Sequence, residues 1–164
     1  MKQILSSTIK VERLILLSPL IFILHVAEET PGFVEWFNSL VERGISQRLF
    51  LTVNIEALTI TILIAAAVAI GEAKGAVILA LGWLSFLMFA NALFHTVGTI
   101  AHDKYSPGFV TGVILYLPYF IWFLYRSIRQ YAISMLTAST AIVSGSLPML
   151  IHGYLIVFEG RRLF

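Results

Sequence analysis

Apolar runs long enough to cross a membrane dominate this chain of 164 residues. A helix that crosses a bilayer needs about 20 mostly apolar residues, because each residue rises about 1.5 Å through roughly 30 Å of hydrocarbon. Five stretches meet this requirement: 14–26 (extended to about residue 30), 49–70, 76–101, 109–125 and 132–158. The sequence therefore predicts an all-α integral membrane bundle of about five transmembrane helices, folded as a single domain over residues 1–164.

The composition agrees with this fold class and excludes several others. Hydrophobic residues make up 59% of the chain and charged residues only 12%, about half the charged fraction of an ordinary globular protein. The net charge of +2 is too small for a nucleic-acid-binding surface, so we expect no nucleic-acid partner. Without cysteine, the chain cannot form disulfides or thiolate metal sites. We expect a multi-pass protein of the cell inner membrane that is surrounded by lipid.

The segment between the first two runs predicts a helix that lies in the membrane interface. Over residues 31–43, aromatic and aliphatic side chains alternate with polar ones in an amphipathic pattern. Three roles are open for this helix, namely a lid, a membrane anchor or a dimer contact.

Ionisable and amide side chains inside the apolar runs are the candidate functional residues, because such groups are costly at membrane depth and usually serve a function. When successive runs alternate in direction, all of these side chains fall on one side of the membrane, within about 10 Å of its surface. They are His25, Glu28, Glu29, Glu56, Asn91, His95 and His152. Their convergence predicts one shared site.

Spacing within two of the runs indicates a metal site, with a structural polar network as the alternative. Glu28 and Glu29 follow His25 at i+3 and i+4, and Asn91 and His95 repeat the i, i+4 relation. Zinc, iron and manganese accept such imidazole and carboxylate ligands. We predict one or two divalent metals, zinc or iron. The predicted ligands are His25, Glu28, Glu29, Glu56, His95 and His152.

Three short motifs follow one another along the chain. They are His25-Val26-Ala27-Glu28-Glu29, Asn91-Ala92-Leu93-Phe94-His95 and Tyr105-Ser106-Pro107-Gly108-Phe109-Val110-Thr111. With this order and these gaps, the chain resembles the HXXEE family of membrane proteins over almost its whole length. The resemblance implies a multi-span membrane protein with metal-dependent enzyme activity, for which hydrolysis is a candidate. It implies functional roles for His25, Glu28, Glu29, Asn91, His95, Tyr105, Pro107, Gly108 and Thr111. Glu56 and His152 are not part of the resemblance, and their prediction as site residues depends only on their depth in the membrane.

The leading prediction is a metal-dependent membrane hydrolase that acts on a lipid or another amphiphile, because a shallow site can receive a head group from the interface. The predicted catalytic residues are Glu29 as bridging ligand or general base, Asn91 as an orienting group, and Tyr105 at the mouth of the site. One alternative is a di-iron oxidoreductase acting on a hydrophobic substrate. The other is a protein without enzyme activity, either a metal or proton carrier or a structural membrane module.

Overall fold

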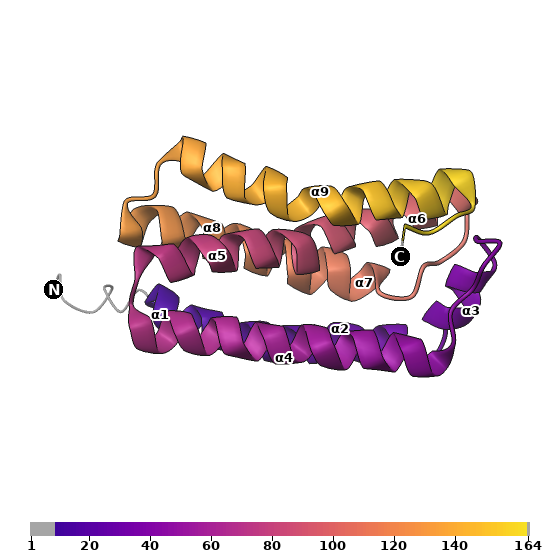
Figure 1. Cartoon of the computed structure of the whole chain (residues 1–164), viewed down its shortest axis with the longest axis horizontal. Helices are drawn as coiled ribbons and strands as arrows, with labels where there is room; N and C mark the ends of the chain where they lie inside the picture. Colours follow the sequence, from indigo (N-terminus) through magenta and orange to yellow (C-terminus); the bar gives the residue numbers. More distant parts are fainter. Residues whose placement is uncertain (1–8, 164) are drawn as a thin grey trace, which may run out of the picture.

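The computed structural model describes residues 9–163, and all regular elements in this part of the chain are helices (Figure 1). The first helix is continuous over residues 11–29 and consists of α1 (Val11–Leu14), a 3₁₀ turn (Ile15–Leu17) and α2 (Ser18–Glu29). It is followed by the short α3 (Phe33–Asn38) and the long α4 (Gln47–Gly71). The third long helix combines α5 (Lys74–Leu84), a π-helical segment (Ser85–Ala90) and α6 (Asn91–His102). The fourth combines α7 (Phe109–Thr111), a second π-helical segment (Gly112–Tyr116) and α8 (Leu117–Tyr131), and α9 (Met135–Glu159) is the last.

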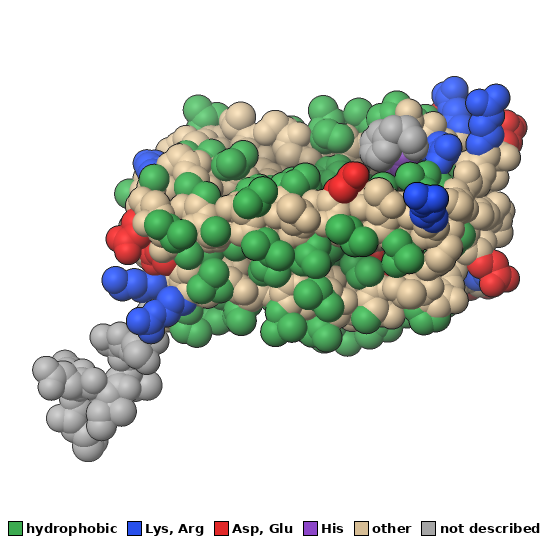
Figure 2. All heavy atoms as spheres, turned by 60° about the horizontal axis from the view of Figure 1, so that its bottom comes forward, with side chains coloured by type: hydrophobic (Ala, Val, Ile, Leu, Met, Phe, Trp, Pro, Cys, Tyr) green, Lys and Arg blue, Asp and Glu red, His purple; other side chains and the backbone are tan. Residues whose placement is uncertain are grey.

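Four of the described helices are long and apolar enough to cross a membrane: Gln47–Gly71, Lys74–His102, Phe109–Tyr131 and Met135–Glu159. The helix over residues 11–29 is not among them, because charged side chains occupy both of its ends. Figure 2 shows hydrophobic side chains across the middle of one face and charged side chains gathered mainly at its two ends. The predicted all-α bundle is therefore confirmed as a fold class, with four helices of spanning length and composition.

The helices pack side by side along one axis (Figure 1). α1 and α2 lie along α4, α4 packs against α5, and α9 lies over α5, the first π-helical segment and α6. α3 lies at the end of the bundle where α2 and α6 finish and α7 begins. Residues that are far apart in the sequence therefore meet at this end.

The predicted amphipathic helix is shorter than expected and packs against protein. It ends at Asn38, because the Asn38 side chain accepts a hydrogen bond from the Ile45 N–H at 2.7 Å and donates one to the Ile45 carbonyl at 2.9 Å. Trp36 and Phe37 are only 2% and 4% exposed, since they join a small core with Phe94 and apolar side chains of α9. Helix α3 therefore covers the end of the bundle, and the predicted helix over 31–43 is corrected to Phe33–Asn38.

One glycine makes the contact between α5 and α9 possible. A Cβ atom on Gly145 would lie 2.1 Å from the carbonyl oxygen of Gly82. Small residues commonly allow such close helix packing in membranes. We expect Gly145→Ala to lower the free energy of unfolding by about 1–3 kcal/mol, as in other overpacked sites, measured by chemical unfolding in detergent. Gly75→Ala is the matched control, because no atom lies within 4 Å of its added Cβ. Equal stability of the two variants would contradict the close packing.

Candidate metal centre

Two histidines and one glutamate come together where α2, α6 and the start of α7 meet. The Oε1 atom of Glu29 lies 3.4 Å from His25 Nε2 and 3.1 Å from His95 Nε2. His25, Glu29 and His95 are 1%, 4% and 0% exposed, and one ligand atom of each lies within 4.8 Å of the others. Within residues 9–163, this is the one cluster of three or more such side chains with metal-binding spacing. We call it the metal centre below.

A glycine lets the loop before α7 press against both imidazoles. Gly108 has a φ of +104°, a conformation that favours glycine. A Cβ atom there would lie 2.8 Å from His95 Nε2 and 2.9 Å from His25 Cε1. The loop therefore closes directly over the two rings because residue 108 has no side chain.

Two hydroxyl groups hold the other ring nitrogens of the histidines. His25 Nδ1 lies 2.8 Å from Thr111 Oγ1, and His95 Nδ1 lies 2.8 Å from the buried Ser106 Oγ. Metal-binding histidines almost always make a hydrogen bond through the nitrogen that does not bind the metal, which fixes the ring orientation. When Nδ1 donates in these pairs, the lone pair of each Nε2 is left to face Glu29.

The distances fit one divalent ion. Both Nε2 atoms are buried, and both face the same carboxylate oxygen, Glu29 Oε1, at ion-pair distance. Ligand atoms at about 2.1 Å around a tetrahedral ion lie about 3.4 Å from one another, close to the two measured distances. The three residues therefore have both the chemistry and the spacing of a metal site.

Glu28 is bound by the start of α7 and by a tyrosine, and not by the histidines. Its Oε1 accepts hydrogen bonds from the backbone N–H groups of Gly108 and Val110 at 3.1 Å, and its Oε2 accepts from Thr111 N–H at 2.7 Å. The Tyr105 hydroxyl also donates to Oε1. Partial burial and this hydrogen bond raise the pKa of Tyr105 to about 12, so Tyr105 stays a protonated donor at neutral pH. Glu28 thus caps a helix whose first N–H groups have no partner inside the helix.

The structure places two of the other predicted ligands away from the metal centre. Glu56 is exposed on α4. His152 is buried on α9, where its Nδ1 accepts a hydrogen bond from the backbone N–H of Leu163 at 3.2 Å. Depth along a helix does not fix the direction of a side chain around the helix axis. Together with the capping role of Glu28, these positions reduce the predicted six-residue ligand set to His25, Glu29 and His95.

Polar and aromatic side chains surround the metal centre. Asn91 lies one turn before His95 on α6, and its Oδ1 is buried without a partner in the described chain. The ring of Tyr116 stacks on His25, with 4.2 Å between centroids. Phe33 and Trp36 of α3 lie over His95, with centroid separations of 5.7 and 6.3 Å. These aromatic rings separate the metal centre from bulk water.

Sequence reasoning did not identify Ser106 and Tyr116. Ser106 lies inside the third motif, so its position beside Tyr105 and Gly108 was an available signal. Tyr116 lies in an apolar run, where a tyrosine resembles an ordinary packing residue. Its unpaired hydroxyl becomes visible only in three dimensions.

A family model of proteins of unknown function with an HXXEE motif matches residues 16–123. The chain belongs to the HXXEE family. The matched region contains all three residues of the metal centre and ends before α9. No curated protein and no solved structure matches the chain. In this HXXEE protein, the histidine and the second glutamate of the motif belong to the cluster that could hold a metal ion, whereas the first glutamate caps α7.

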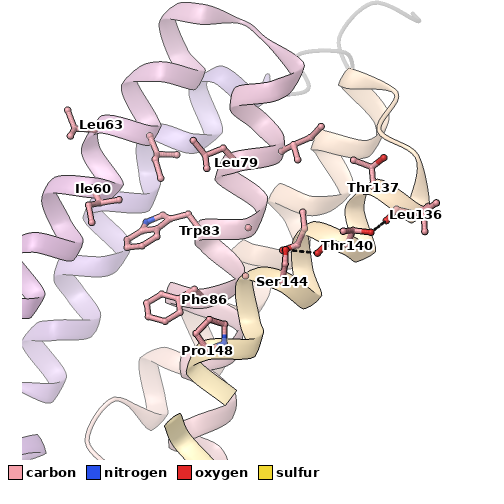
Figure 3. A pocket seen from close by; sticks show the side chains of 15 residues that line it. Ile60, Leu63, Leu79, Trp83, Phe86, Leu136, Thr137, Thr140, Ser144 and Pro148 are labelled. Carbon is pink, nitrogen blue, oxygen red and sulfur yellow. Dashed lines mark hydrogen bonds between the residues drawn. The ribbon is translucent and has the colours of Figure 1, made fainter. Parts of the chain in front are cut away.

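The HXXEE protein also has an apolar groove that is separate from the metal centre (Figure 3). The groove has a volume of about 1090 Å³ and lies between α4, α5 and α9. Figure 3 shows Ile60 and Leu63 on one side of it, Leu136 and Thr140 on the other, and Leu79 and Trp83 between them. The indole N–H of Trp83 donates to Thr61 Oγ1 at 3.0 Å. None of the side chains that line the groove belongs to the metal centre.

Proposed function

We propose that this protein is a metal-dependent membrane hydrolase that acts on a lipid or another amphiphile, with one divalent ion bound by His25, Glu29 and His95. The observation that carries the proposal is the pair of buried Nε2 atoms that face one carboxylate oxygen, while hydroxyl groups hold both Nδ1 atoms. Two histidines and one glutamate are a ligand set of known zinc hydrolases. Bound zinc supplies a water of lowered pKa and a Lewis acid for a carbonyl or phosphoryl oxygen.

The residues around the ion have defined tasks in this proposal. Ser106 and Thr111 orient the two imidazoles, and Glu29 provides the negative charge opposite them. Phe33 and Trp36 exclude bulk water, which strengthens the electrostatic interactions inside the site. Tyr105 acts through Glu28, because its hydroxyl donates to that carboxylate. The proposal gives Tyr105 a positioning role, whereas the sequence predicted a catalytic one.

The position of the metal centre favours an amphiphilic substrate. Glu29 is the last residue of α2, so the centre lies close to one end of the bundle, beneath α3. Helix α2, which carries His25 and Glu29, presents exposed apolar side chains such as Leu20 and Leu24 to its surroundings. A head group can approach from the interface while its hydrocarbon chain stays in lipid.

Hydrolysis of p-nitrophenyl octanoate by the zinc-loaded protein in detergent tests this function. We expect activity that is removed by a chelator, restored by zinc and absent from Glu29→Gln, because the glutamine cannot supply the ligand charge. Glu56→Gln is the matched control and should keep the wild-type rate, since Glu56 is exposed and outside the centre. Activity that survives both the chelator and Glu29→Gln would contradict the proposal.

A second candidate function is an iron-dependent oxidoreductase acting on a hydrophobic substrate. It is favoured by the same ligand set, because two histidines and one carboxylate also form the facial triad of non-haem iron oxygenases. The triad would hold one iron, in place of the two predicted for a di-iron enzyme. Consumption of O₂ by the Fe²⁺-loaded protein, with no ester hydrolysis by the zinc form, would favour this candidate.

We further propose that residues 11–29 form a fifth span and that the protein lies in the cell inner membrane. The helix reaches roughly 28 Å at about 1.5 Å per residue, close to the thickness of the hydrocarbon core. It lies along α4, and its outward side chains include Leu16, Leu20 and Ile23. The charged ends fit a span whose ends lie at the two membrane surfaces. A helical bundle is also the form expected of an inner-membrane protein, whereas outer membranes use barrels.

Labelling of single cysteines tests the number of spans, and the chain has no cysteine of its own. Five spans place Lys10 and Arg162 on opposite sides of the membrane. We therefore expect a membrane-impermeant maleimide to label Lys10→Cys and Arg162→Cys in vesicles of opposite orientation. Labelling of both in vesicles of the same orientation would show an even number of spans and contradict the fifth.

A further inference from the structure

Tyr116 has a buried hydroxyl group that the proposed function does not use. The residue is 0% exposed, and its hydroxyl has no hydrogen-bond partner in the described part of the chain. The phenol ring stacks on the His25 imidazole, with 29° between the ring planes. A buried hydroxyl without a partner is unfavourable, whereas phenylalanine would fill the same space without that cost. The hydroxyl is therefore expected to serve a purpose other than packing.

The phenol lies on the side of its helix that approaches the metal centre. Side chains lean toward the N-terminus of their helix, and this helix begins beside the metal centre at Gly108 and Phe109. Tyr116 is also the last residue of the π-helical segment Gly112–Tyr116, and π-helical segments frequently occur at functional sites.

A neighbouring tyrosine shows that the unpaired hydroxyl is not a general property of this helix. Tyr119 lies three residues later and is 5% exposed. Its hydroxyl donates to the Leu14 carbonyl at 3.0 Å. The helix therefore provides a partner for one buried phenol and leaves the one beside the metal centre without a partner.

We propose that the Tyr116 hydroxyl donates a hydrogen bond to an oxygen atom of the ligand held at the metal centre. The ligands of the site are then molecules with a carbonyl or phosphoryl oxygen, which the phenol recognises as a hydrogen-bond acceptor. This inference rests on the proposed function, because it requires a metal ion at His25, Glu29 and His95.

Acetohydroxamate binding to the cobalt-loaded full chain tests the inference. Cobalt reports both metal binding and oxygen-ligand binding through its visible absorption. We expect wild type, Tyr116→Phe and Tyr119→Phe to bind one cobalt each. Acetohydroxamate should bind about tenfold more weakly to Tyr116→Phe, the loss that one hydrogen bond gives, and with wild-type affinity to Tyr119→Phe.

Unfolding of the metal-free proteins provides a second measurement. Tyr116→Phe should keep or raise the unfolding midpoint, because the hydroxyl has no protein partner, whereas Tyr119→Phe should lower it. Three results would overturn the inference. They are equal acetohydroxamate affinity of wild type and Tyr116→Phe, no acetohydroxamate binding to cobalt-loaded wild type, and a lowered midpoint of Tyr116→Phe. Failure of wild type to bind cobalt would instead contradict the proposed function itself.

Discussion

Replacing Glu28 with alanine should lower the free energy of unfolding by about 2–5 kcal/mol, because the helix cap contributes about 0.5–2 kcal/mol and the hydrogen bond from the Tyr105 hydroxyl to the charged carboxylate about 1.5–3 kcal/mol. The substitution removes the acceptor of the N–H groups of Gly108, Val110 and Thr111 and of the Tyr105 hydroxyl. Chemical unfolding in detergent measures the loss. Stoichiometric metal binding should remain, because His25, Glu29 and His95 are unchanged.

The Tyr105→Phe and Glu28→Gln variants provide the controls for this prediction. Tyr105→Phe removes one hydrogen-bond donor to Glu28 and should lower the free energy of unfolding by less than Glu28→Ala does. Glu28→Gln keeps an acceptor oxygen but loses the charge, so its stability should be intermediate. A Glu28→Ala protein that is as stable as wild type and cannot bind metal would show that Glu28 is a ligand, as the sequence suggested.

Replacing Glu29 or His95 with alanine should weaken metal binding by more than about 100-fold, because substitutions of outer-shell residues alone typically cost 10–100-fold. Each substitution removes one of three ligand atoms of the metal centre. Ser106→Ala should weaken metal binding by about 10–100-fold, since it removes only the hydroxyl that holds His95 Nδ1. Competition with a chromophoric chelator measures these affinities.

Glu56→Ala is the matched control for this series. It removes a carboxylate from a long helix, as Glu29→Ala does, but Glu56 is exposed and outside the metal centre. Its metal affinity should equal that of wild type. If Glu56→Ala lost as much metal affinity as His95→Ala, the assignment of the ligands would be contradicted.

The sequence predicts the positions of the candidate residues along their helices, because these positions follow from the apolar runs. It correctly brings His25, Glu29 and His95 together, since the first two lie one turn apart and the third lies at the same end of the bundle. The family resemblance carried by these residues is also confirmed. The membrane bundle follows from the same runs, and four of them are helices of spanning length.

The direction of side chains around a helix axis could not be predicted in the same way. Glu28 and Glu29 are adjacent in the sequence and point to different partners, because the loop over residues 103–108 brings the start of α7 to Glu28. Glu56 and His152 have the expected depth but lie away from the metal centre. Helix α4 packs against α2 with another face, and α9 packs against α5 and α6.

Neutral polar residues gave little signal in the sequence. Ser106 and Tyr116 carry no charge, so burying them is not costly enough to mark them as functional, and Thr111 was indicated only by its place in the third motif. Two of them hold the imidazoles and the third stacks on His25. The length of α3 was overestimated for a related reason, because the Asn38 side chain bonds locally to Ile45 and ends the helix.

The metal centre is tested most directly by loading wild-type protein with zinc, measuring the metal content and recording the X-ray absorption spectrum. We expect one zinc per chain, with two imidazole nitrogens at about 2.0–2.1 Å and oxygen ligands in the remaining positions. No stoichiometric metal after loading with zinc, iron or manganese would contradict it. A bound zinc whose spectrum lacks imidazole ligands would contradict it equally.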